Sequence, residues 1–238
     1  MGGAEVHHSH RDVTGGWLRP AVFGVSDGLV SNLGLIVGVA GGASAAGATG
    51  TTAVVIAGLA GLAAGAFSMA AGEYVSVASQ AELARAEIDL ERRELARRPE
   101  AEMAELADLW VSRGLDREFA EEFARQLTRD PEKALEVHAR EELGLTLDDL
   151  PNPWVAAGSS FVAFALGALL PVLPYLVGVT SVLPSLVLSL LGLFGAGALV
   201  ARVTARPWWY SGLRLLVVGA LAAGVTWVVG TLVGTGLS

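Results

Sequence analysis

Apolar residues are concentrated in five long runs, which are separated by short loops and by one long charged segment. A helix needs about 20 mostly apolar residues to cross a membrane. Five stretches meet this requirement: 21–41, 53–73, 155–176, 182–203 and 212–235. The mean hydropathy of +0.53 over the whole chain is also too high for an ordinary soluble domain. The pattern therefore predicts an all-α membrane protein with five transmembrane helices per subunit.

Charged residues are concentrated between the second and third of these runs. Of the 24 acidic residues, 21 lie from Glu73 to Asp149, and the same segment holds 11 of the 16 basic residues. The second run is followed by more than 20 residues without glycine or proline, rich in Ala, Leu, Glu and Arg, which are strong helix formers. We therefore expect the second helix to continue as far as Pro99. Three shorter helices are expected after it: 100–112, 116–128 and 131–144.

These elements divide the chain into four parts. We expect an N-terminal arm (1–20), a first pair of membrane helices (21–73), an acidic helical module (74–150), and three more membrane helices (151–238). Arginines flank the membrane helices on one side only, and the loops 42–52 and 178–181 carry no charge. Basic flanks favour the cytosolic side. The N-terminus and the module are therefore expected in the cytosol, and the C-terminus outside.

Glycine spacing predicts close packing of the first two membrane helices. Pairs of glycines four residues apart allow helix backbones to approach each other, and three such pairs lie within the first two predicted spans: Gly24 with Gly28, Gly34 with Gly38, and Gly61 with Gly65. These helices are therefore expected to form the packing core, within a subunit or between two subunits. Pro171 and Pro174 are expected to kink or break the third membrane helix.

The acidic module contains two pairs of carboxylates at helical spacing. Glu91 with Glu94, and Glu102 with Glu105, are each three residues apart and share a helix face. Because the two helices are joined at Pro99, all four side chains can come together. Clustered carboxylates repel each other unless a cation neutralises them, and their oxygens suit divalent metals. The alternative is a solvated charged surface, in which the arginines of the same segment pair with these acids.

A histidine and a further acid extend this candidate site. His138 and Glu142 are four residues apart on the last helix of the module. An imidazole added to carboxylates moves the metal preference toward Fe²⁺, Mn²⁺ or Zn²⁺. The N-terminal histidines His7, His8 and His10 are expected to belong to a polar arm.

A second candidate site lies inside the membrane helices. A charged group there is costly and usually functional, and Asp27 is the one ionisable side chain well inside a predicted span. Met69 and Glu73, near the end of the second span, share a helix face at a similar depth. A thioether with two carboxylates suits a transition metal such as Fe²⁺. The alternatives are a hydrogen-bonded structural acid for Asp27, a packing residue for Met69 and a helix-end acid for Glu73.

Three segments resemble a known family. PAVFGVSDGLVSNLGLIVGVAGG, AGAFSMAAGEYVSVASQAEL and REELGL are similar to the vacuolar iron transporter family over nearly the whole chain. The resemblance implies a homodimer of five-helix subunits that exports Fe²⁺, often also Mn²⁺, from the cytosol in exchange for protons. It assigns the ion path to Asp27 and Met69, with Glu73 nearby. It also assigns metal capture to the module, through Glu91, Glu94, Glu102 and Glu105. His138 stands where the family typically has a methionine, and Glu142 keeps the acid.

Composition restricts the remaining possibilities. A net charge of −8 argues against a nucleic-acid partner. Because the membrane spans contain no histidine and no nucleophile–base pair, we do not expect an enzyme, and we expect no prosthetic group.

The abundance of Ala, Gly and Arg with a single Lys favours a bacterial source, and therefore the plasma membrane. A membrane-anchored metal sensor or a storage-linked metal-binding protein remains the alternative to a transporter.

Overall fold

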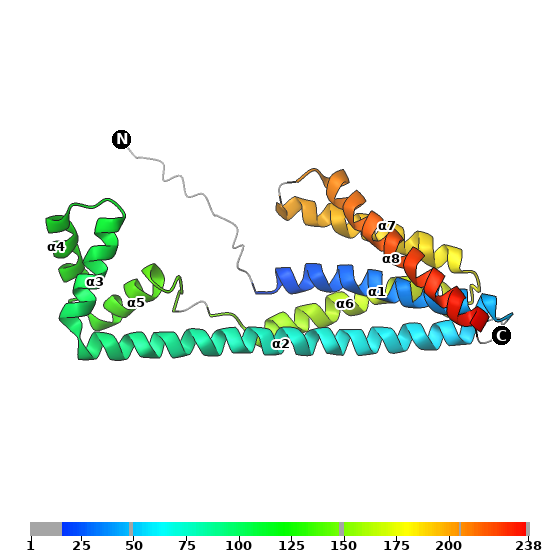
Figure 1. The fold of residues 1–238 in the computed structure, drawn as a ribbon, viewed down its shortest axis with the longest axis horizontal. Coiled ribbons are helices and arrows are strands. Elements are labelled where there is room, and N and C mark those ends of the chain that lie inside the picture. The colour runs from blue at the N-terminus through cyan, green and yellow to red at the C-terminus, as the bar shows by residue number, and fades with distance from the viewer. Residues whose placement is uncertain (1–15, 48–49, 148–149, 205, 237–238) are drawn as a thin grey trace, which may run out of the picture. The chain divides into compact units, whose positions relative to one another are not determined.

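The computed structural model describes residues 16–47, 50–147, 150–204 and 206–236, and in these ranges the chain is all helical (Figure 1). Five of the helices are long and apolar enough to cross a membrane, which confirms the five predicted spans. The helices are α1 (Leu18–Ala45), α2 (Thr51–Arg97), α3 (Pro99–Ser112), α4 (Arg117–Leu127), α5 (Pro131–Glu141), α6 (Pro153–Leu176), α7 (Val182–Thr204) and α8 (Trp208–Gly236).

The helices form two compact units. Residues 1–74 and 153–238 make one of them, here called the apolar unit, and residues 75–152 make the other, here called the inserted unit. Helix α2 begins in the apolar unit and ends in the inserted unit without interruption, as its lack of glycine and proline after Gly72 predicts.

Helix α1 is the centre of the apolar unit and packs against α6, α7 and α8. The predicted glycine pairs explain the contacts with α6 and α8. A Cβ atom on Gly28 would lie 2.3 Å from the Phe164 carbonyl oxygen of α6, and one on Gly38 would lie 3.2 Å from the Thr226 carbonyl oxygen of α8. Both glycine pairs of α1 therefore serve packing inside one subunit, since only residues without a side chain allow backbones to come this close.

The two prolines of α6 do not break the helix, so that part of the expectation is wrong. Pro171 and Pro174 lie in its last two turns, and the helix continues to Leu176. Each proline removes only one backbone hydrogen bond, because its missing N–H group would have bonded the carbonyl four residues earlier, and the other bonds of the helix are kept. A neighbouring helix also supplies a polar partner, because the Ser185 hydroxyl of α7 donates to the Pro171 carbonyl at 2.7 Å.

Short helices joined by tight turns build the inserted unit. The side chains of Asp116 and Asp130 accept hydrogen bonds from the backbone N–H groups of Glu118 and Glu132, and so cap the starts of α4 and α5. A cluster of Leu106, Ala107 and Ala124 forms the core between α3 and α4. The turn after α5 contains Gly144 at a φ of +66°, a conformation that favours glycine.

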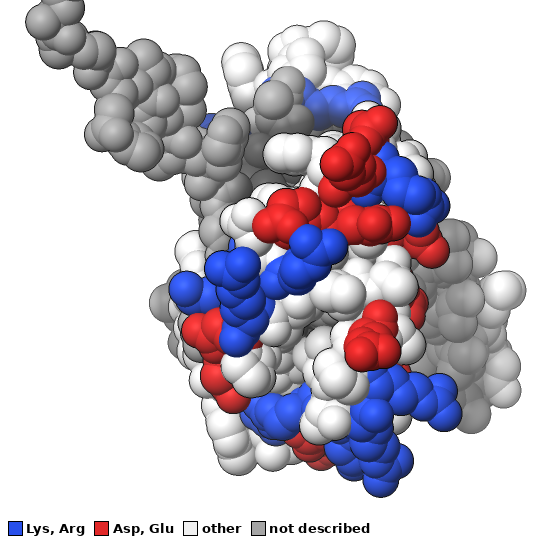
Figure 2. Space-filling view, turned by 90° about the vertical axis from the view of Figure 1, so that its left-hand side faces the viewer, with Lys and Arg blue, Asp and Glu red and all other residues white. Residues whose placement is uncertain are grey.

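Acidic and basic side chains are interspersed over the face of the molecule drawn in Figure 2. The inserted unit contains exposed ion pairs, among them Arg117 with Asp108 at 3.0 Å and Arg140 with Glu136 at 2.6 Å. Such pairs stabilise a fold very little. Many charges of the inserted unit thus form the solvated surface that was the alternative to a metal site, and only the buried acids need another explanation.

Candidate metal centres

An acid occupies a core position of α2. Buried residues recur along this helix at alternating spacings of four and three: Val77, Ala81, Ala84, Ile88 and then Glu91. Glu91 thus continues an apolar stripe that faces the interior of the inserted unit, and it is only 7% exposed. A carboxylate is almost never buried in this way without a partner.

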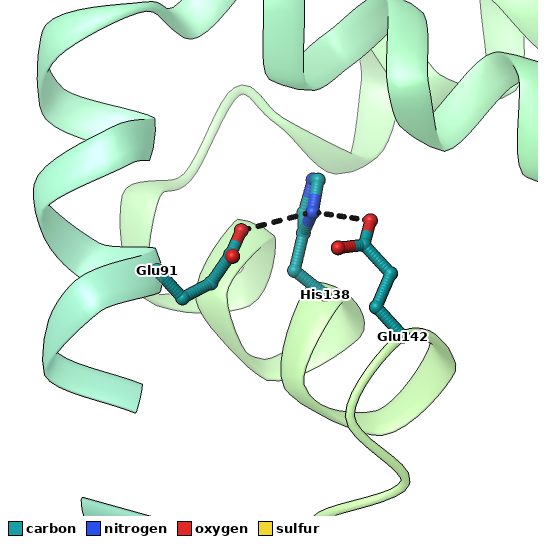
Figure 3. Close-up of side chains that lie close together, drawn as sticks. All are labelled: Glu91, His138 and Glu142. Carbon is teal, nitrogen blue, oxygen red and sulfur yellow. Dashed lines mark ion pairs between the residues drawn. The ribbon is translucent and has the colours of Figure 1, made fainter. Parts of the chain in front are cut away.

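Its partner is a buried histidine on α5. His138 has a completely buried side chain, and its Nδ1 lies 3.1 Å from Oε1 of Glu91 and 2.8 Å from Oε1 of Glu142 (Figure 3). One ligand atom from each of the three residues lies within 4.8 Å of the others. Donors on opposite sides of one divalent ion are about 4 Å apart, since each bond is about 2.0–2.2 Å long. The three residues therefore form a group of the size of one coordination site.

The polar atoms of this group are not satisfied by protein hydrogen bonds. Among the described residues, both ring nitrogens of His138 and Oε1 of Glu91 are buried without a hydrogen-bond partner, so the two short contacts of Nδ1 lack hydrogen-bond geometry. Buried polar atoms are rarely left in this state. A cation bound by the carboxylates and the imidazole would give these atoms a partner.

Burial and mutual repulsion change the acidity of the carboxyl groups. Burial raises the pKa of Glu91 to about 7; the charge of His138 opposes this shift and nearby carboxylates add to it. Burial also raises the pKa of Glu142 to about 7, with further increases from Glu105, Glu102 and Glu94. The pKa of Glu102 is raised as well, first by burial and then by Glu105. A divalent cation would relieve this repulsion.

The two members of each predicted carboxylate pair differ in burial. Glu91 and Glu102 are buried, whereas Glu94 and Glu105 are exposed and are not among the three residues whose ligand atoms converge. None of these four acids forms an ion pair with an arginine within the described part of the chain. Arg92 instead pairs with Asp89 at 3.2 Å. Pairing with arginine, the alternative considered from the sequence, therefore does not account for these acids.

The second candidate site is a pocket of about 230 Å³ in the apolar unit. Asp27 of α1 and Met69 of α2 both line it, whereas Glu73, one turn beyond Met69, is not among its lining residues. The carboxylate of Asp27 has no hydrogen bond or ion pair among the described residues. Met69 also packs against the cluster of Ala66, Phe164 and Ala168, so it contributes to packing as well as to the pocket wall.

Asn32, which was not predicted as a site residue, also lines this pocket. Its Nδ2 donates to the Gly58 carbonyl of α2 at 3.1 Å and to the Ala168 carbonyl of α6 at 2.6 Å. An amide in an otherwise apolar span, five residues after Asp27, was the available signal. The N-terminal histidines considered above lie outside the described residues.

A sequence model of the VIT family matches residues 18–231. The chain belongs to the VIT family. The match includes both candidate sites and all five apolar helices, so this member of the family is a multi-pass membrane protein.

Three relatives show how far this similarity extends. A protein from Acanthamoeba castellanii named vacuolar iron transporter is 37% identical over 196 residues, which are 77% of this chain and 67% of that protein. Vacuolar iron transporter 2 of rice (Oryza sativa subsp. japonica) is 33% identical and covers 91% of this chain and 87% of its own. Vacuolar iron transporter 1 of Arabidopsis thaliana is 30% identical, with 91% and 86% covered.

Proposed function

We propose that this protein exports Fe²⁺, and also Mn²⁺, from the cytosol in exchange for protons. One observation carries the proposal: a carboxylate and a thioether, Asp27 and Met69, line a single pocket among the membrane helices. Ligands of this mixed character favour a transition metal over Na⁺ or Ca²⁺. The names of the relatives, which are iron transporters, agree with this chemistry.

In this proposal the inserted unit lies in the cytosol and captures the metal. The arginines that flank the helices support this orientation, because basic flanks favour the cytosolic side. Glu91, His138 and Glu142 would bind the ion directly, while the exposed Glu94 and Glu105 and the buried Glu102 raise the negative potential around them. The relatives are named for the vacuole; for this chain we propose the bacterial plasma membrane, with the C-terminus outside.

A homodimer is part of the proposal. Ser31 and Ser68, which line the pocket beside Asp27, are exposed on the surface of a single subunit, together with the apolar side chains of Leu35 and Phe67. Hydroxyl groups and a carboxylate at such a surface would meet lipid in a monomer, which is unfavourable. A second copy of the chain across this face would enclose the polar groups in a path between two subunits.

The exchange of metal for protons follows from the chemistry of a carboxylate. The same oxygen cannot hold a proton and a metal ion together, so protonation lowers metal affinity. On the acidic side of the membrane, protonation of Asp27 or Glu73 would release the ion. On the cytosolic side, loss of the proton would restore the site for the next ion.

This proposal can be tested with proteoliposomes. Fe²⁺ is supplied from outside, and the proton gradient drives protons in the opposite direction. Asp27→Asn keeps the size of the side chain but removes its charge, so we expect Fe²⁺ flux to fall to the level of empty liposomes. Asp89→Asn is the matched control, because Asp89 is an exposed acid of α2 that pairs with Arg92. Wild-type flux in Asp27→Asn would contradict the proposed role of Asp27.

A membrane-anchored metal sensor or a storage-linked protein is the second candidate. It is favoured by the position of the converging ligands, which all belong to the compact inserted unit. A protein of this kind would bind Fe²⁺ without moving it. Proteoliposomes that bind the metal but show no uptake under any proton gradient would favour it over a transporter.

A further inference from the structure

Asn32 is a buried amide whose orientation is fixed by its neighbours. It is 2% exposed, and its Nδ2 donates to carbonyl oxygens on two other helices, at Gly58 and Ala168. A carbonyl oxygen cannot donate, so the side-chain atom facing these two acceptors must be the nitrogen. The amide oxygen, Oδ1, is therefore directed away from them.

This oxygen has no hydrogen-bond partner of its own. Oδ1 of Asn32 is buried and unpaired among the described residues. It lies against Gly61, which also lines the pocket, since a Cβ atom on Gly61 would be 2.8 Å from it. An unpaired buried carbonyl is unfavourable. The pocket of about 230 Å³ is several times the roughly 30 Å³ that a water molecule occupies, so it has room for a partner.

The other polar groups of the pocket show what kind of partner fits. Ser31 donates its hydroxyl hydrogen to the backbone oxygen of Asp27 at 2.6 Å, so its own oxygen offers only lone pairs to a ligand. The Asp27 carboxylate and the Met69 sulfur are acceptors too. None of the described lining residues is Lys, Arg or His. Ser68 has the one hydroxyl among the described lining residues whose hydrogen has no acceptor. The pocket wall therefore offers mainly acceptor atoms, which suit a cation or its water ligands.

We propose that Oδ1 of Asn32 is a further contact of the transported cation, and binds the ion or one of its water ligands next to Asp27 and Met69. The nitrogen of the same amide meanwhile holds α1 against α2 and α6. An uncharged oxygen increases affinity without a second negative charge in the membrane. The ion is thus bound firmly enough to enter and weakly enough to leave. This inference rests on the transport function proposed above.

Three variants of the full-length protein separate ion contact from a structural role. Asn32→Leu removes Oδ1 and both hydrogen bonds. Asn32→Asp keeps an oxygen toward the pocket and adds negative charge. Gly61→Ala leaves the amide in place but puts a methyl group at the position of close approach to Oδ1; its other close neighbour, Leu35, is flexible and exposed. Ser185→Ala is the matched control, because it removes a buried interhelical hydrogen bond away from this pocket.

The readout is Fe²⁺ and Mn²⁺ uptake by proteoliposomes, with KM and kcat measured for each monodisperse variant. We expect KM to rise about tenfold for Asn32→Leu, and in the same direction for Gly61→Ala. For Asn32→Asp we expect KM to fall and kcat to fall with it, because release slows. Ser185→Ala should keep the wild-type KM.

Several results would overturn the inference. A wild-type KM in Asn32→Leu would overturn it. If Asn32→Leu does not fold, a wild-type KM in Gly61→Ala would overturn it instead. An equal rise in KM for Asn32→Leu and Asn32→Asp, or for Ser185→Ala, would indicate a purely structural role. In each of these cases wild-type uptake persists and only this inference fails. If the wild-type protein itself moves neither metal, the proposed transport function fails and the inference falls with it.

Discussion

Nδ1 of His138 lies 3.1 Å from Oε1 of Glu91, so an imidazole of α5 faces a carboxylate of α2 in the interior of the inserted unit. Both residues occupy positions that an ordinary small helical domain would fill with apolar side chains, and both are buried. Replacing apolar contacts by a polar cluster is unfavourable unless the cluster is satisfied. Binding of a divalent cation would satisfy it.

The first prediction concerns the acid on the other side of His138. Glu142→Gln keeps the shape of the side chain but removes a charged ligand 2.8 Å from Nδ1. Loss of an outer-shell partner typically lowers metal affinity by about 10- to 100-fold. Loss of a direct ligand should cost at least as much. Isothermal titration of the full-length protein with Mn²⁺ in detergent measures this effect.

Glu136→Gln is the matched control for this measurement. Glu136 lies on the same helix, but its side chain is half exposed and pairs with Arg140. We expect its Mn²⁺ affinity to stay within about twofold of wild type, since exposed pairs of this kind contribute little. Equal losses in both variants would show that general negative charge, and not the buried group around His138, determines binding.

The second prediction is that the metal-free inserted unit becomes less stable as pH rises. Burial raises the pKa values of Glu91 and Glu142 from the ordinary 4.5 to about 7 in the folded protein. A carboxyl group whose pKa is raised on folding binds more protons in the folded state. Its stabilising contribution is therefore complete below about pH 4.5 and is lost as pH rises through about 7. Hydrogen exchange of α5 amides, corrected for intrinsic rates, should show lower protection at pH 8 than at pH 6.

Metal should reverse this dependence. At pH 8 the carboxylates are charged and available, so Mn²⁺ should bind and restore the protection of α5. At pH 6 protons compete with the metal, and the same concentration should have a smaller effect. In Glu142→Gln one of the two titrating groups is absent, so we expect a smaller pH effect than in the wild type. Unchanged protection from pH 6 to pH 8 without metal would contradict the raised pKa values of Glu91 and Glu142.

Most of the helices could be predicted because local signals mark their ends. Helix α2 ends at Arg97, just before Pro99, and α5 begins at Pro131 after the capping residue Asp130. These signals act through backbone geometry and capping, which depend only on neighbouring residues. The expectation for α6 failed because the effect of a proline in a membrane helix depends on which neighbouring helices can offer polar partners, and those neighbours are not adjacent in the sequence.

The candidate sites could be predicted only in part. Spacing places Glu91 and Glu94 on one helix face, but the packing of α2 against α5 decides that Glu91 is buried and Glu94 is exposed. The apolar stripe that ends at Glu91 is the one local signal in the sequence for the burial of this acid. Asn32 shows the limit more clearly, because its role depends on carbonyl groups at Gly58 and Ala168, which are distant in the chain.

The last prediction concerns the contact between α1 and α6, which positions both Asp27 and Asn32. In Gly28→Ala the new methyl group would lie 2.3 Å from the Phe164 carbonyl oxygen and 2.9 Å from the Ala168 nitrogen. Both are backbone atoms, so they cannot turn aside, and the helices must separate. Overpacking of this kind typically costs about 1–3 kcal/mol. The melting temperature of the detergent-solubilised protein should therefore fall.

Gly158→Ala is the matched control, because Gly158 is also a helical glycine but has nothing within 4 Å of its added Cβ atom. Alanine is favoured over glycine in a helix by about 1 kcal/mol, so this variant should melt at the wild-type temperature or above it. If helix propensity alone governed the response, Gly28→Ala would be stabilised in the same way. A drop in Gly28→Ala alone thus identifies the backbone contact between α1 and α6 as the cause, and a loss of transport with it would link that contact to the pocket.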